Sequence, residues 1–313
     1  MSATDATRTA EFDAFGPWVD EVHDATEVPA LYRDHPVDFA TSHLVLKVPR
    51  NISRRDALPT MHLYDHLIVV APAALTVLSR AGDNRTGDNR TGDSYTESSI
   101  GYGDIAVIED SVDLVDGRLG IHTRAGTTLT VPYNGSSQQV ITRLTDVLRD
   151  LASAAAGSGA TRDLPHPDAP PAALDLLDLG KQDVGLVTSY FDLLRHEPDA
   201  ALLAAHGRIA LAPSGGLVSR VLHAVRPMTL HGAVVCRTER ELQIVGRRHW
   251  LVRGKAPELS RALTTIPLAA IDAITLHPHP KYLAASVVTF ALGALRYEAV
   301  LPTGSPAERL LAG

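Results

Sequence analysis

The sequence predicts an α+β protein made mainly of antiparallel β-strands and arranged in two domains of the same kind. Two observations predict this fold class. Short segments rich in β-branched residues lie between Gly, Asp and Pro, and several alternate apolar and polar residues, as half-buried strands do. The order of these segments then occurs twice along the chain, and each series ends in a helical pattern.

The first series of predicted strands lies within residues 60–155. Its segments are 67–70, 75–80, 95–100, 104–108, 117–123 and 127–132. Asn134 and the residues after it then supply helix-capping groups. Beyond this cap, apolar residues recur at intervals of three and four, which predicts an amphipathic helix; they are Val140, Ile141, Leu144, Val147, Leu148 and Leu151.

The second series lies within residues 200–313 and follows the same order. Its segments are 233–236, 241–245, 261–266, 270–274, 286–290 and 297–302. The last strand ends at Pro302, much as the first series ends at Pro132. Ser305 then suits the N-cap of a closing helix and Pro306 suits its first position.

The remaining residues predict connections. Residues 1–59 are expected to form an extension with a short helix and an edge strand at Leu44–Pro49. Residues 156–199 are expected to form a linker, rich in Ala, Gly, Ser and Pro at its start, followed by an amphipathic helix over 183–196. Gly82–Thr91 reads GDNRT twice and has no core-forming residue, which predicts a loop.

The repeated pattern resembles the pleckstrin-homology-like (PH-like) domains of bacteria, of the actinobacterial type. Three stretches carry the resemblance, namely Cys236–Ile244, Ile266–Ile274 and Ile100–Ile108. The resemblance implies two tandem PH-like domains, at 60–155 and 200–313. Each is expected to be a small β-barrel or sandwich closed by a C-terminal helix.

Composition limits the compartment and the redox chemistry. The chain has one cysteine, Cys236, which lies in an apolar run and fits a small buried hydrophobic residue. The polar N-terminus lacks the pattern of a signal peptide, and the longest apolar stretch, 283–295, is too short to span a bilayer. We therefore expect a cytoplasmic protein, with peripheral membrane association as an alternative.

The charge is uneven along the chain. The net charge is −7 overall. Residues 1–156 hold 13 basic and 22 acidic residues, for −9, and residues 157–313 hold 16 and 14, for +2. The acidic total disfavours binding to nucleic acid, so no nucleic-acid partner is expected.

Motifs of known chemistry are absent from the sequence. There is no phosphate-binding Gly loop, no Gly-x-Ser-x-Gly and no His-Glu-x-x-His. His62 and His66 flank Asp65, but they lie in a predicted strand, where this spacing is wide for a shared metal. The acidic turn 109–116 is expected to be solvated. We therefore expect a non-enzymatic protein with no catalytic residues, cofactor or metal.

The best candidate site is a basic stretch in the second domain. Residues 237–261 hold seven basic and three acidic residues, a net charge of +4. Arginine suits bidentate contacts to phosphate. Four of the cations, from Arg247 to Lys255, are expected together on one exposed edge. The candidate anion-binding residues are Arg237, Arg240, Arg247, Arg248, Arg253 and Lys255.

Three functions remain open at this point. The first is a binding or scaffold protein that engages a protein or peptide by strand addition at an exposed sheet edge. The second is a peripheral binder of anionic lipid through the basic surface of the second domain. The third is an enzyme with an unrecognised site at the interface between the domains.

Overall fold

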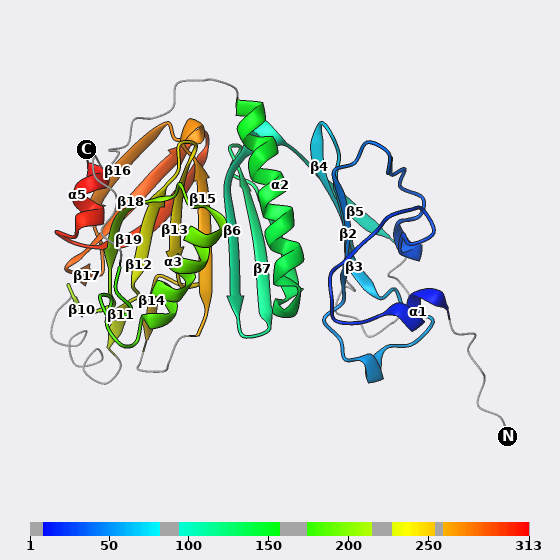
Figure 1. The fold of residues 1–313 in the computed structure, drawn as a ribbon, viewed down its shortest axis with the longest axis horizontal. Coiled ribbons are helices and arrows are strands. Elements are labelled where there is room, and N and C mark those ends of the chain that lie inside the picture. The colour runs from blue at the N-terminus through cyan, green and yellow to red at the C-terminus, as the bar shows by residue number, and fades with distance from the viewer. Residues whose placement is uncertain (1–8, 82–93, 157–173, 215–226, 254–258, 313) are drawn as a thin grey trace. The chain divides into compact units, whose positions relative to one another are not determined.

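The fold consists mainly of antiparallel sheets with a few helices, as the sequence predicts (Figure 1). The computed structural model describes residues 9–81, 94–156, 174–214, 227–253 and 259–312. The chain divides into two compact units. Unit 1 comprises residues 1–104, 115–117 and 129–155, and unit 2 comprises residues 105–114, 118–128 and 156–313.

Unit 1 is built around a five-stranded antiparallel sheet in the order β1-β2-β3-β4-β5. Large apolar side chains such as Leu67 and Leu78 are fully buried in its core. Because β1 pairs with the outer side of β2, the strand at 44–49 is not the edge strand that the sequence predicts. The strands are β1 (Asp20–Glu21), β2 (Leu44–Pro49), β3 (Tyr64–Val70), β4 (Ala74–Arg80) and β5 (Tyr95–Gly101).

Three further elements complete unit 1. They are α1 (Ala10–Ala14), the strand β8 (Thr128–Asn134) and the long helix α2 (Gln138–Ala156). The predicted apolar stripe on α2 is confirmed, since Ile141, Leu144 and Leu148 are fully buried. The predicted GDNRT loop lies outside the described residues, and so does most of the linker after α2.

The main sheet of unit 2 joins strands that are far apart in the sequence. Strands β7, β6, β15, β13, β12 and β9 are successive neighbours in it, and its central pairings are antiparallel. Their bounds are β6 (Ile105–Asp113), β7 (Asp116–Thr123), β9 (Ala201–His206), β12 (Ala233–Arg237), β13 (Glu241–Gly246) and β15 (Arg261–Pro267).

Two smaller sheets and two helices complete unit 2. One sheet has the order β16-β18-β19, and the other has the order β14-β11-β10-β17. Helix α3 packs Leu186 and Tyr190 on the main sheet at Val234 and Cys236. The bounds are α3 (Val184–His196), β10 (Ile209–Pro213), β11 (Met228–Leu230), β14 (Leu251–Arg253), β16 (Ala273–Pro278), β17 (Tyr282–Leu283), β18 (Ala285–Leu292), β19 (Leu295–Pro302) and α5 (Pro306–Ala312).

Two series of elements along the chain share part of their order. Strands β2 to β5 precede the 3₁₀ turn η3 (Tyr102–Asp104), and β6 to β8 and α2 follow it. The later series has β9 to β15 before the 3₁₀ turn η5 (Leu268–Ala270), then β16 to β19 and α5; it matches the first series when the strands β10, β11, β14 and β17 of the smaller four-stranded sheet are set aside. Each turn follows a seven-residue strand directly. Each series thus has a seven-residue strand, a 3₁₀ turn, further strands and a final helix in that order, and the later series has additional strands.

The pairing of β6 with β15 lies within unit 2 but joins the two sequence segments. Arg261 of β15 stands opposite Val112 of β6, and Thr265 stands opposite Ile108. One sheet therefore contains strands from both 60–155 and 200–313, and the compact units follow other boundaries than these segments. Each sheet of the described residues has two end strands, so none of them closes into a barrel.

Candidate functional site

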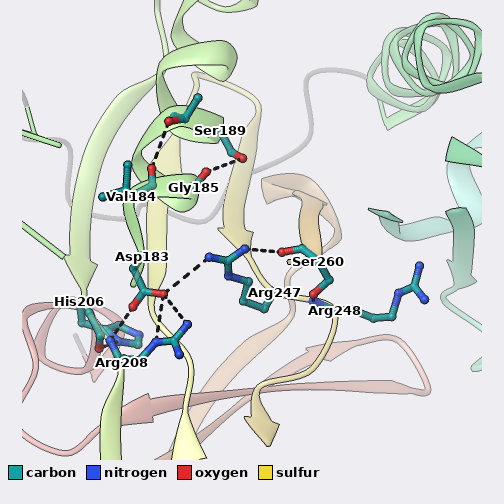
Figure 2. A network of polar contacts seen from close by, with 11 residues as sticks. Asp183, Val184, Gly185, Ser189, His206, Arg208, Arg247, Arg248 and Ser260 are labelled. Atoms are coloured by element: carbon teal, nitrogen blue, oxygen red, sulfur yellow. Dashed lines mark hydrogen bonds and ion pairs between the residues drawn. The ribbon is translucent and has the colours of Figure 1, made fainter. Parts of the chain in front are cut away.

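The arginines of the basic stretch lead to a buried ion network in unit 2 (Figure 2). The side chain of Asp183, just before α3, is fully buried. Its carboxylate accepts hydrogen bonds from Arg208, from Nη2 at 3.1 Å and from the backbone amide at 2.9 Å. The Nη2 atom of Arg247 lies 3.7 Å from the same carboxylate. One buried acid thus holds two basic side chains.

Arg247 is fixed from two sides. Its Nη1 atom donates a hydrogen bond of 2.6 Å to the carbonyl oxygen of Ser260, and its side chain is only 6% exposed. The expectation of an exposed Arg247 is therefore wrong. The strand alternation of β13 ends at Gly246, and the chain then turns the guanidinium inward because a carboxylate is buried there.

Two glycines make room for this network. A Cβ atom on Gly232 would lie 2.9 Å from the Asp183 carboxylate and 2.8 Å from the His206 carbonyl oxygen. A Cβ atom on Gly207 would lie 2.4 Å from the carbonyl oxygen of Leu179. A larger residue at Gly232 would therefore clash with Asp183, and one at Gly207 would clash with the backbone at Leu179.

His206 borders the network as a buried imidazole. Its Nδ1 atom lies 3.1 Å from the carbonyl oxygen of Gly207, which assigns the proton to Nδ1. Burial lowers the pKa of His206 from its usual 6.5, against smaller opposing effects of this hydrogen bond and of Asp183. The imidazole is therefore neutral at pH 7, which fits a structural role.

Arg248 connects strands instead of facing an external anion. Its amide donates to the Ser260 hydroxyl at 3.0 Å. Its guanidinium donates to Ser111 of β6, from Nε to the hydroxyl and from Nη2 to the carbonyl oxygen, each at 3.3 Å. Because β6 pairs with β15, Arg248 stabilises the place where these two strands meet.

The remaining predicted cations lie apart from Arg247. Arg240 lies in the turn before β13 and Arg247 follows the end of that strand. Six residues of strand separate them by about 20 Å. Arg237 ends β12, and the exposed Arg253 ends β14 in the smaller four-stranded sheet. Lys255 lies outside the described residues.

A second polar cluster supports the meeting of β6 and β15. Thr264 of β15 stands opposite Glu109 of β6, and its hydroxyl lies 3.2 Å from the Tyr297 hydroxyl. The Glu109 carboxylate lies 3.5 Å from Nε2 of His122. Burial, and then the nearby Glu109 carboxylate, raise the pKa of Tyr297 well above its usual range. The phenol therefore stays protonated and acts as a hydrogen-bonding group.

No larger ligand cluster accompanies these groups. Across the ranges that the structure describes, no group of three or more His, Cys, Asp and Glu side chains is arranged to hold a metal ion. The thiol of Cys236 is fully buried, and burial raises its pKa to about 12. A thiol with so high a pKa is a poor nucleophile at neutral pH.

The outer strand β5 of unit 1 presents an exposed polar surface. Four successive side chains on it are exposed, from Thr96 to Ser99. At its start the ring of Tyr95 packs against Tyr32, with the centroids 5.5 Å apart. The Glu97 carboxylate lies 3.7 Å from the His35 ring. These contacts anchor the strand while its outer side remains exposed.

The backbone of β5 offers hydrogen-bonding groups on that outer side. The amide of Ala81 donates to the carbonyl oxygen of Ser94 at 2.9 Å, so these two residues form a hydrogen-bonded pair. Every second residue of β5 from Ser94 onward then bonds to β4. Since bonded and non-bonded pairs alternate in an antiparallel sheet, Glu97 and Ser99 direct their amides and carbonyls away from β4. This edge can accept another strand.

Comparison with known proteins adds no relative. The chain matches no protein-family model, no curated protein and no solved structure. No described helix has both the length and the apolar character needed to cross a membrane.

Proposed function

We propose that this chain is a non-enzymatic binding protein that engages a protein or peptide by strand addition to β5. The observation that carries the proposal is the outer side of β5, a seven-residue strand at the end of its sheet with four successive exposed side chains. Backbone groups at Glu97 and Ser99 supply affinity, and the side chains between them supply selectivity.

The resemblance to tandem PH-like domains belongs to the same proposal. It is supported by the shared order of a seven-residue strand, a 3₁₀ turn, further strands and a final helix in the two series. In this scheme β5 is the last strand before the turn in the first domain, and β15 is its counterpart in the second. A fold with open sheet edges suits a protein whose task is binding.

The side chains of β5 define the partner. Thr96 and Ser98 favour Thr or Ser on the facing strand, because such cross-strand pairs hydrogen-bond. Glu97 disfavours an acidic residue directly opposite. The partner is therefore an extended segment with hydroxyl, β-branched or apolar residues and without an acidic residue at its centre.

The contacts of the arginines favour this proposal over lipid binding. Arg247 already binds the carboxylate of Asp183, and Arg248 already binds Ser111. Among the predicted cations with described positions, Arg240 and Arg253 have exposed side chains, but they lie on different sheets or turns. A lipid headgroup would lack the convergent arginines that the sequence suggests.

Peptide selection tests the proposal. A random peptide library is selected on sparsely immobilised wild-type protein, and binders are then measured against Glu97→Pro. Proline at position 97 removes an outward-facing amide that the protein's own sheet does not use. We expect selected peptides to lose at least about tenfold in affinity, since 1.4 kcal/mol corresponds to a factor of ten.

The matched control is Glu298→Pro on β19. Glu298 is also an exposed glutamate on an end strand. The amide of Thr303 donates to Ala284, so by alternation the Glu298 amide also faces away from β18. This variant should keep full affinity. Peptides that bind all three proteins equally would contradict the proposal.

A further inference from the structure

One strand addition already occurs within the chain, where β6 pairs with β15 in a defined register. β6 adds to the open side of β15, with Leu263 opposite Asp110, Thr264 opposite Glu109 and Thr265 opposite Ile108. Arg248 and Tyr297 reinforce this pairing through Ser111 and Thr264. The outer side of β15 is thus filled by a strand that begins just after a 3₁₀ turn.

The strands that correspond to β15 and β6 are β5 and β16, and each of them has an open side. β5 precedes η3 as β15 precedes η5, and both strands have seven residues. β16 follows η5 much as β6 follows η3. β5 ends the five-stranded sheet and β16 ends the three-stranded sheet. One pair, β15 with β6, is therefore formed within the chain. The corresponding strands, β5 and β16, each keep an open side.

The outward-facing backbone groups of β5 would lie opposite the outward-facing backbone groups of β16. The amide of His279 donates to Ala285 at 2.8 Å, so by alternation Ile274 and Leu276 direct their backbone groups away from β18. Glu97 and Ser99 do the same on β5. If β16 paired with β5 in the same register as β6 with β15, Leu276 would stand opposite Glu97 and Ile274 opposite Ser99. Outward groups therefore meet outward groups along both strands.

The side chains also fit this register. Ser98 matches Thr264, because each is the fourth residue of its seven-residue strand. Thr275 matches Glu109, because each is the fifth residue after its 3₁₀ turn. Ser98 and Thr275 are exposed and would stand directly opposite, as a hydroxyl pair. Pro278 lacks an amide proton, so the ladder would end there, as β6–β15 ends at Val112.

We propose that a second copy of this chain docks β16 on the open side of β5 and so repeats the β6–β15 pairing between molecules. This inference rests on the proposed function, since both use the same side of β5, and it names the partner as the chain itself. The interface is heterologous, because different surfaces of the two copies meet.

Disulfide trapping tests both the partner and the register. Ser98→Cys and Thr275→Cys are prepared as separate proteins and mixed under oxidising conditions. Non-bonded antiparallel pairs bring Cα atoms to about 4.5 Å, which suits a disulfide. The native Cys236 is fully buried and does not compete. We expect a linked species of twice the 33.4 kDa monomer mass, formed only in the mixture.

Thr96→Cys is the register control. It is exposed on the same strand and lies two positions from Ser98, where diagonal neighbours are about 7–8 Å apart. Mixed with Thr275→Cys, it should link several-fold more slowly. Equal rates for the two mixtures, or links formed by Ser98→Cys alone, would overturn the proposal.

Sedimentation separates this inference from the proposed function. Wild-type protein should associate as its concentration rises, Glu97→Pro should remain at 33.4 kDa, and Glu298→Pro should associate like the wild type. Wild-type protein that stays monomeric while selected peptides still bind β5 would overturn self-association and leave the peptide-binding function in place.

Discussion

The carboxylate of Asp183 accepts two hydrogen bonds from the guanidinium of Arg208, from Nε at 3.3 Å and from Nη2 at 3.1 Å. It also lies 3.7 Å from Nη2 of Arg247. Because Asp183 is fully buried, its charge balances two basic groups that would otherwise be costly to bury. Arg247, one of the arginines that suggest an anion-binding surface in the sequence, thus serves the interior of unit 2.

The first prediction concerns this buried acid. Asp183→Asn should lower the free energy of unfolding by about 3 kcal/mol, because it leaves two basic groups without their counter-charge. Asp192→Asn, on the helix α3 that follows Asp183, is the control. Asp192 is 43% exposed and forms a surface pair with Arg195, so its loss should cost less than about 0.5 kcal/mol. Equal urea midpoints for the two variants would contradict this account.

The second prediction concerns pH. Burial lowers the folded-state pKa of both His206 and His66 from 6.5. Below pH 6.5 the unfolded chain binds protons that the folded chain does not, so stability should fall as the pH drops from 6.5 toward the folded-state values. Urea unfolding between pH 7.5 and 5 measures this. His206→Gln should have a smaller pH slope than the wild type, and an unchanged slope would contradict the role of His206.

The third prediction concerns lipid. Wild-type protein should stay in solution with anionic phospholipid vesicles in a flotation assay at low salt, because Arg247 and Arg248 are engaged inside the protein. Arg253→Glu, an exposed change, should behave in the same way. Flotation of the wild type that Arg253→Glu abolishes would restore the lipid-binding alternative.

The fourth prediction concerns the turn between β6 and β7. Leu114 has φ of +54° there, a conformation that suits Gly or Asn, and its side chain is 71% exposed. Leu114→Asn should raise the free energy of unfolding by about 1 kcal/mol, since it relieves strain and exposes little new surface. Leu58→Asn, exposed and without positive φ, should give no gain.

The elements of the fold could be predicted from the sequence because their signals are local. The alternation in 241–245 and the three-to-four spacing in 140–151 each lie within one element, β13 and α2. The strands and side chains that these elements contact could not be predicted. Nothing local shows that Ile108 pairs with Thr265, or that Asp183 holds Arg208, 25 positions away in the sequence.

The burial of Arg247 could not be predicted for a related physical reason. A run of arginines shows where positive charge lies along the chain, but burial depends on whether a distant acid meets it. Asp183 lies 64 positions before Arg247, so no local spacing connects the two residues. The open side of β5 was equally hidden, because a strand pattern does not show which strands lie at the end of a sheet.

Amide hydrogen exchange along β5 tests the central claim most directly. In dilute protein the amides of Glu97 and Ser99 should exchange quickly, because they face outward, while those of Thr96 and Ser98 should be protected by β4. When a selected peptide or a second copy of the chain binds, Glu97 and Ser99 should become protected as well. Protection of these two amides in dilute, unbound protein, or their continued fast exchange in the complex, would contradict strand addition at β5.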